Sequence, residues 1–418
     1  MIVRKRFFYG YWITLVGLTT LTLTCGLIWY GFSVLNKPIA DYFGWSRSEV
    51  TAAFSIFVIA QAAISPIVGR LTDKHGPRQV FFFGTIIMAL ALVLLSRTSA
   101  IWNFYLLYLC LGIGYVFLGA IPISIIISNW FYRLRGTMQG LAFTGIGFGG
   151  LVMTPLIGNY LLPNLGWQSV YLVIAFILSA TMLPLIFFVV RNHPQQKGLL
   201  AYGQEAAEIP DKNGAKIKAA TGLSVKEALG TPTFWIVGLT SAVYSMAMTG
   251  AVQNQISILN EQSFATTEAV VSIGAIGLFS AIGKFLFGSL CDRINPKYAA
   301  AISYGMVAFS LVIMIQAQSI THLWLYTVIM GLGQGGWAPN LAMLAANYFG
   351  LKHYGAVLGA IHLLFMGGSA VGPVIVGFAY DQTGSYRLII LIIAVLCFIA
   401  VPAIAIIRKP KIRQQIMD

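Results

Sequence analysis

The sequence predicts an all-α membrane protein of twelve transmembrane helices, arranged as two pseudo-symmetric bundles of six. Of its 418 residues, 58% are hydrophobic and only 9% are charged, whereas soluble domains have about a quarter charged residues. Apolar runs of about 20 residues, the length that crosses a bilayer, recur along the chain. A motif at the end of the second run returns in the second half of the chain, which indicates a duplicated unit.

The apolar runs give the order of the spans. The first, residues 7–35, is too long for a secretory signal peptide and is expected to be the first span. The other spans are expected near 49–69, 79–96, 101–130, 138–162, 168–190, 232–258, 268–290, 298–317, 322–348, 355–380 and 386–407. Residues 191–231 are polar and are expected to form a linker. The predicted organisation is an N-terminal bundle (1–190), a cytoplasmic linker (191–231) and a C-terminal bundle (232–418).

The lysines and arginines predict the orientation. The net charge of +14 is spread over short segments between spans and not over one soluble face, so it does not indicate nucleic-acid binding. Only four cations outside the spans fall on the side opposite the termini: Lys37, Arg47, Arg97 and Arg387. Because cytoplasmic loops are rich in lysine and arginine, both termini and the linker are expected in the cytoplasm. The expected location is the cell membrane, the inner membrane in a bacterium.

The repeated motif lies between the second and third spans of each half. Gly69-Arg-Leu71-Thr-Asp73-Lys74-His-Gly76-Pro77-Arg78 recurs 219 residues later as Gly288-Ser-Leu290-Cys-Asp292-Arg293-Ile-Asn295-Pro296-Lys297. Near the same offset, Gly112-Ile-Gly114 corresponds to Gly331-Leu-Gly333. The two halves are therefore expected to be parallel copies of one six-helix unit.

Charged residues of these loops are candidates for a conformational latch. Asp73 and Asp292 follow helix ends, where carboxylates can pair with nearby cations and cap a neighbouring helix. We expect the latch to involve Asp73, Arg78, Asp292, Lys297, Arg133 and Arg135. The alternative is a topology anchor without a switching role, since exposed ion pairs often contribute under about 1 kcal/mol.

Lys284 is the main candidate for substrate binding. It lies well inside the eighth span, where insertion of an ammonium costs at least about 2.5 kcal/mol, so such a residue indicates function. None of the twelve acids lies deep in a predicted span. A buried ammonium without a counter-ion either loses its proton or binds an anion, and we therefore expect an anionic substrate.

Two stretches resemble known transporter families. The repeated loop is similar to the signature loop of the major facilitator superfamily, in which parallel halves enclose a site near the midplane and alternate its access. The stretch from Asn129-Trp130-Phe131-Tyr132-Arg133 to Gly145, and Lys284 four residues before Gly288, resemble the monocarboxylate transporters and the related bacterial oxalate/formate-type antiporters. This resemblance implies that Lys284 binds a carboxylate.

The chain departs from that family at two positions. Where the family often has a carboxylate one turn before the cation, this sequence has Ser280, and Tyr30 stands in place of a first-helix lysine. A coupled proton would then be carried by His362, by Lys284 or by the substrate, because an imidazole titrates near neutral pH. His362 is otherwise a second anion contact or a neutral interhelical hydrogen-bond residue. Further substrate-binding candidates are Tyr30, Tyr115 and Gln334, of which the last two are repeat equivalents.

These observations predict a secondary transporter that carries a small organic anion by alternating access. The favoured substrate is a monocarboxylate such as lactate or pyruvate, moved with a proton. The alternatives are a carboxylate exchanger, a proton-driven exporter of amphipathic cations and a transporter-like sensor. We find no catalytic motif, metal-ligand spacing or cofactor motif, so no enzyme activity, metal or cofactor is expected. The protein is expected to act as a monomer in the bilayer.

Overall fold

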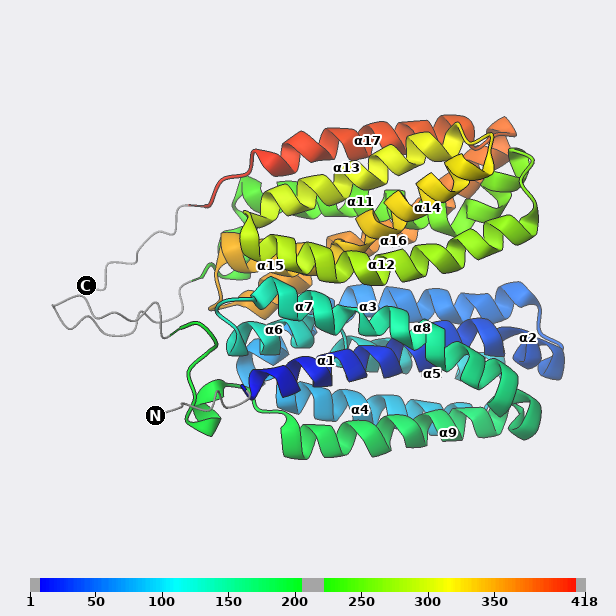
Figure 1. Ribbon diagram of the computed structural model, residues 1–418. Coiled ribbons are helices and arrows are strands. Elements are labelled where there is room, and N and C mark those ends of the chain that lie inside the picture. Colours follow the sequence, from blue (N-terminus) through cyan, green and yellow to red (C-terminus); the bar gives the residue numbers. More distant parts are fainter. Residues whose placement is uncertain (1–7, 205–221, 411–418) are drawn as a thin grey trace, which may run out of the picture. The chain divides into compact units, whose positions relative to one another are not determined.

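The computed structural model describes residues 8–204 and 222–410, and these divide into two compact units. Unit 1 lies within residues 1–217 and unit 2 within 218–418 (Figure 1). Within the described residues the structure is helical, with two isolated β-bridges and no strand. In the described part of the chain, ten helical segments are long and apolar enough to cross a membrane.

These ten segments correspond to eleven spans, because one segment crosses twice, and a twelfth span is divided into two short helices. The segment Arg135–Val189, with 55 residues, is long enough to cross twice, and it reverses at Gly166, whose φ of 73° breaks the helix. The tenth predicted span is divided into two shorter helices at Gly336, and neither helix alone is long enough to cross a bilayer. The predicted fold class is thereby confirmed.

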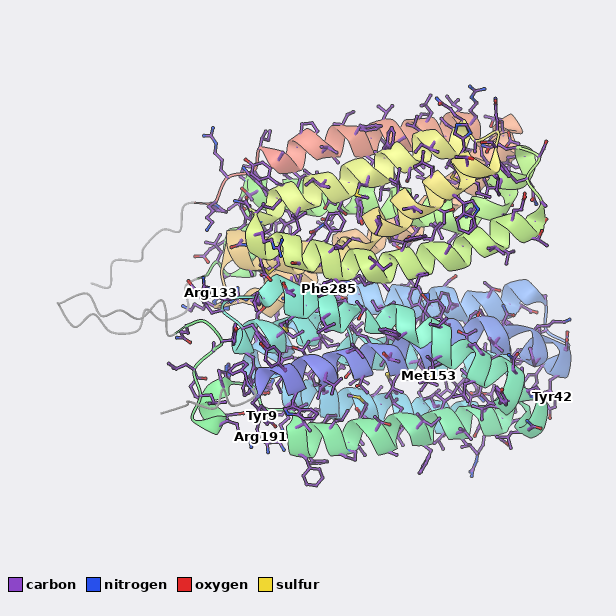
Figure 2. All side chains as sticks on the ribbon, viewed as in Figure 1. Tyr9, Tyr42, Arg133, Met153, Arg191 and Phe285 are labelled. Carbon is purple, nitrogen blue, oxygen red and sulfur yellow. The ribbon has the colours of Figure 1, made fainter. Side chains whose placement is uncertain are left out.

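In unit 1, the first span combines α1 (Gly10–Thr24), a π-helical segment η1 (Cys25–Tyr30) and α2 (Gly31–Phe43). The next two spans are α3 (Arg47–His75) and α4 (Pro77–Leu95), and the fourth is α5 (Ile101–Phe117) with α6 (Ala120–Trp130). The fifth span is α7 (Arg135–Phe143), α8 (Gly145–Pro155) and η2 (Leu156–Leu161), and the sixth is the greater part of α9 (Leu162–Pro184) with η3 (Leu185–Val189). Figure 2 places Tyr9 and Arg191 at one end of the unit and Tyr42 at the other, with Met153 between them.

In unit 2, a short helix α10 (Val225–Leu229) precedes the spans. The spans are α11 (Pro232–Glu261), α12 (Thr266–Arg293), α13 (Pro296–Ile315), α14 (Ile320–Gly335) with α15 (Trp337–Phe349), α16 (Tyr354–Thr383) and α17 (Arg387–Ala405). The fourth span of each unit is therefore discontinuous. The breaks, at Leu118–Gly119 and at Gly336, occupy corresponding places in the repeat.

Small residues hold the first and fifth spans of each unit together. In unit 1, a Cβ on Gly149 would lie 2.5 Å from the carbonyl oxygen of Thr22, and in unit 2 a Cβ on Gly372 would lie 2.5 Å from that of Met246. Thr249 adds a hydrogen bond of 3.0 Å from its hydroxyl to the carbonyl oxygen of Ser369. Close backbone approach replaces the hydrophobic effect as the source of helix association in lipid.

The two ends of the predicted linker are structured. The amide of Tyr202 donates to the carbonyl oxygen of Trp130 (2.9 Å), and the Trp130 indole donates to that of Arg191 (2.8 Å). In unit 2, Leu223 donates to the carbonyl oxygen of Phe349 (2.8 Å). Residues 191–204 thus pack on unit 1 and residues from 222 on unit 2. The middle of the predicted linker, 205–221, lies outside the described residues.

Candidate substrate-binding site

Lys284 lies on α12 and is 3% exposed. Its Nζ donates to the Oγ of Ser280 at 2.7 Å and to the carbonyl oxygen of Ser280 at 3.4 Å. Helical side chains lean toward the N-terminus of their helix, so the ammonium is directed away from the nearer end of the helix at Arg293. The side chain therefore does not snorkel toward that end, and its charge stays within the span.

Glycines bring the Lys284 backbone against the break in the tenth span. A Cβ on Gly335 would lie 2.6 Å from the amide nitrogen of Lys284, and a Cβ on Gly283 would overlap the carbonyl oxygen of Leu332. Real Cβ atoms do not approach backbone this closely, so only glycine allows α12 and α14 to cross here. The crossing fixes Lys284 beside the end of α14.

Gln334 lies at the same break, next to Gly335 in the chain. Its Oε1 is buried and has no hydrogen-bond partner among the described residues. A buried acceptor without a donor costs about 1–3 kcal/mol, which makes it a candidate for contact with a ligand or water. The structure thus brings two of the predicted residues, Lys284 and Gln334, to one helix crossing.

His362, on α16, belongs to an aromatic group that begins directly after this break. The imidazole is 8% exposed, and its centroid lies 6.0 Å from the ring of Phe365 and 6.4 Å from that of Trp337. Trp337, the first residue of α15, stacks on Phe365 at 5.2 Å. Neither Trp337 nor Phe365 is among the residues that the sequence singles out. The double glycine Gly335-Gly336 was the available signal, since adjacent glycines often mark helix breaks.

Tyr30 and Tyr115 meet at the π-helical segment of unit 1. Tyr115 shares a hydrogen bond of 2.9 Å with the thiol of Cys25, which is the first residue of η1. Tyr30 is the last residue of η1. The ring of Tyr30 packs on Gly150, where a Cβ would lie 3.0 Å from Cε2. π-Helical segments frequently occur at functional sites. Tyr30 and Tyr115 therefore both lie at this segment of unit 1, while Lys284, Gln334 and His362 belong to unit 2.

Three of the six predicted latch residues contact helix ends in their own unit. Arg78 donates to the carbonyl oxygens of Ile186 (3.1 Å) and Phe187 (3.0 Å), and Lys297 donates to that of Ile407 (3.3 Å). Arg135 donates to the carbonyl oxygen of Phe131 at 3.1 Å. Each cation satisfies carbonyls that a helix end leaves unpaired.

Of the other three predicted latch residues, two lie at the ends of α3 and α12, and the third lies beside Gly203. Asp73 is exposed on the last turn of α3, and Asp292 is partly buried on the last turn of α12. Arg133 is exposed, and its aliphatic stem covers Gly203. Among the described residues, no group of three or more His, Cys, Asp or Glu side chains could hold a metal ion.

Comparison with known proteins decides the family. A family model described as Major Facilitator Superfamily matches residues 18–279 and 254–416. The chain belongs to the major facilitator superfamily. It is a multi-pass membrane protein of this transporter family, in agreement with the resemblance of its repeated loop.

The names of similar proteins point to different kinds of substrate. The chain is 25% identical to an oxalate:formate antiporter of Oxalobacter formigenes, over 81% of this chain and 73% of that protein. It is also 25% identical to monocarboxylate transporter 2 of Homo sapiens, over 85% of this chain and 76% of that protein. The multidrug resistance protein MdtG of Dickeya zeae is 24% identical, over 82% of this chain and 80% of that protein.

Proposed function

We propose that this superfamily member is a secondary transporter that moves a small monocarboxylate, such as lactate or pyruvate, together with a proton. One observation carries the proposal: among the described residues, Lys284 is the only buried residue of the Asp, Glu, Lys and Arg types. An ammonium held in a low-dielectric interior favours an anion as its ligand. The names of two relatives, an oxalate:formate antiporter and a monocarboxylate transporter, support the same substrate class.

In this proposal, Lys284 binds the carboxylate and Gln334 contacts a donor group of the substrate. Tyr30 and Tyr115 are the substrate-binding candidates of unit 1. His362 or Lys284 carries the proton, because both side chains are buried within spans and each has a nitrogen that can bind a proton. Transport proceeds by alternating access in a monomer. The protein lies in a bacterial inner membrane, with both termini on the cytoplasmic side.

We also propose that Asp73 and Asp292 help to set the conformational state, with Arg78, Lys297, Arg133 and Arg135 holding the helix ends around them. Asp73→Asn should then slow the exchange of access and leave equilibrium binding nearly unchanged. Cysteine accessibility of the spans, with and without substrate, measures this exchange. An unchanged labelling pattern and rate would leave Asp73 as a topology anchor.

A carboxylate exchanger is the second candidate. Ser280 is the observation that favours it, because a neutral hydroxyl accepts the hydrogen bond from Lys284 at the position where a carboxylate could bind a proton. Export of amphipathic cations fits less well, since the buried charge has the wrong sign for a cationic substrate.

Reconstitution into proteoliposomes distinguishes the candidates. Under symport, uptake of labelled lactate or pyruvate rises with an inward proton gradient and collapses with a protonophore. Under exchange, uptake ignores the gradient but requires a carboxylate such as oxalate or formate inside the vesicle. Failure to transport any carboxylate under both conditions, with transport of a lipophilic cation, would overturn the proposal.

A further inference from the structure

We propose that Tyr244 and Ser303 are positioning residues, whose hydroxyl groups hold the break in the tenth span in place beside Lys284. The inference rests on the proposed function for its effect on carboxylate binding. Tyr244 lies on α11 and Ser303 on α13, and both are buried, with exposed fractions of 1% and 0%. Both act on the substrate only through the backbone of α14.

The carbonyl oxygen of Gly333, two residues before the end of α14, accepts hydrogen bonds from both backbone and side chains. The amide of Gly336 donates to it at 3.1 Å, which tightens the last turn of the helix. The hydroxyl groups of Tyr244 and Ser303 donate to it as well, each at 2.8 Å. The two hydroxyl oxygens are 3.2 Å apart. Buried donors from two other spans thus converge on one backbone oxygen where the helix ends.

The double glycine Gly335-Gly336 links these hydroxyls to Lys284. A Cβ on Gly335 would lie 2.6 Å from the amide nitrogen of Lys284. A Cβ on Gly336 would lie 2.5 Å from the Oγ of Ser303. The first glycine therefore admits the backbone of α12, and the second admits the serine hydroxyl. Because the two glycines are adjacent, the hydroxyls that hold the break also fix the point at which α14 meets Lys284.

Unit 1 fills the corresponding space in another way. At the repeat offset of 219 residues, Ser303 corresponds to Gly84 and Gly336 to Phe117. A Cβ on Gly84 would lie 2.5 Å from the Cβ of Phe117, so here the small residue is on the third span and the large one on the fourth. In unit 2 the glycine is on the tenth span and the serine on the ninth. The unit that carries Lys284 thus has a hydroxyl where the other unit has an apolar contact.

The alternative is a structural role, in which the hydroxyls satisfy a buried carbonyl and contribute only to stability. Tyr304 provides the matched control. Its ring stacks on that of Tyr244, with the centroids 4.5 Å apart, and it is also buried. Its hydroxyl shares a hydrogen bond of 3.1 Å with Ser241 on α11. Tyr304→Phe therefore removes a buried hydroxyl from the same stacked pair without removing a donor to the break.

The first measurement reports on the break without any ligand. Gln334→Cys places a thiol at a partly exposed position of the break, and Cys110→Ser removes the one native thiol that is not buried. In phosphatidylcholine nanodiscs, a neutral maleimide labels this thiol. Tyr244→Phe and Ser303→Ala should each raise the labelling rate about fivefold, the factor that corresponds to one hydrogen bond. Tyr304→Phe should leave the rate unchanged.

The second measurement uses the chain with Gln334 intact. Counterflow of labelled lactate into proteoliposomes preloaded with lactate proceeds under either symport or exchange. Tyr244→Phe and Ser303→Ala should raise the KM about fivefold and leave the maximal rate nearly unchanged, because they displace a binding group and not a mobile element. Tyr304→Phe should change neither quantity. A purely structural role would not separate these variants.

Wild-type labelling rates in both Tyr244→Phe and Ser303→Ala would overturn the proposal, and so would equal effects of Tyr304→Phe. In a chain that transports lactate, wild-type KM values in both variants would overturn it too, while the proposed function would stand. If the wild type carries no lactate, the proposed substrate is wrong, and the labelling rates alone decide whether the two hydroxyls hold the break. The two failures are therefore distinguishable.

Discussion

Arg78 and Lys297 make the same contact in the two units. Each follows the proline that begins the third span of its unit, and each donates to backbone carbonyl oxygens where the last span ends: Ile186 and Phe187 for Arg78, Ile407 for Lys297. The last carbonyls of a helix have no partner within it, and a cation there also opposes the helix dipole. The repeat has thus preserved a helix cap that joins the third and sixth spans.

Removal of either cap should destabilise its unit. We expect Arg78→Gln and Lys297→Gln each to lower the free energy of unfolding by about 1 kcal/mol, the net contribution of a hydrogen bond. Thermal unfolding in detergent measures the effect, and Arg70→Gln, an exposed cation on α3, is the control. An unchanged melting temperature with an altered transport rate would instead indicate a switching role.

Lys284→Gln should abolish substrate binding while the protein still reaches the membrane. The amide keeps the length of the side chain nearly constant and removes the charge that attracts the carboxylate. Lys284→Arg should retain part of the activity, because the positive charge remains. Binding is measured by substrate protection against thermal unfolding. Wild-type affinity in the Gln variant would show that the carboxylate binds elsewhere.

Ser280→Asp should make binding depend on pH. A carboxylate one helical turn from Lys284 would pair with its ammonium, so anion affinity at neutral pH should fall at least about tenfold, equivalent to about 1.4 kcal/mol. Protonation of the new carboxyl group would free the ammonium, so affinity should recover as the pH falls. Ser280→Asn, neutral and of similar size, should stay near wild type. Equal affinity of the Asp and Asn variants at all pH values would count against a Lys284 site.

Gly335→Ala should disrupt the crossing of α12 and α14. The added Cβ would lie 2.6 Å from backbone atoms of Gly283 and Lys284, and overpacking of this kind costs about 1–3 kcal/mol. Gly277→Ala on α12 is the matched control, since no other described atom lies within 4 Å of a Cβ there. We expect lower thermal stability and weaker substrate affinity only in the Gly335 variant. Similar behaviour of the two variants would show that the crossing is not tight.

His362→Gln should weaken the response of uptake to a proton gradient. The amide can hydrogen-bond but does not titrate near neutral pH, so uptake should continue with a reduced gradient dependence. Phe365→Leu, which removes the stacked ring without changing any titratable group, is the control for altered packing. If His362→Gln leaves the gradient dependence intact, the imidazole serves as an interhelical hydrogen-bond residue and the proton is carried elsewhere.

Composition and periodicity were enough to predict the twelve spans and the repeat. In lipid every backbone polar group must bond within its own helix, so a spanning helix must be a continuous apolar run that is visible in one sequence. The same logic singled out Lys284, because a cation inside such a run is conspicuous. The fixed offset between Asp73 and Asp292 likewise indicates the duplication.

Contacts between distant segments required the folded chain. The sequence marked Arg78 as a charged loop residue, but its partners, Ile186 and Phe187, lie more than a hundred residues away. The Trp337–Phe365 stack beside His362 depends on how α15 meets α16. The direction of the Lys284 ammonium toward Ser280 also depends on side-chain rotamers and helix crossings. Such contacts are set by packing in three dimensions, which hydrophobic periodicity along one chain does not encode.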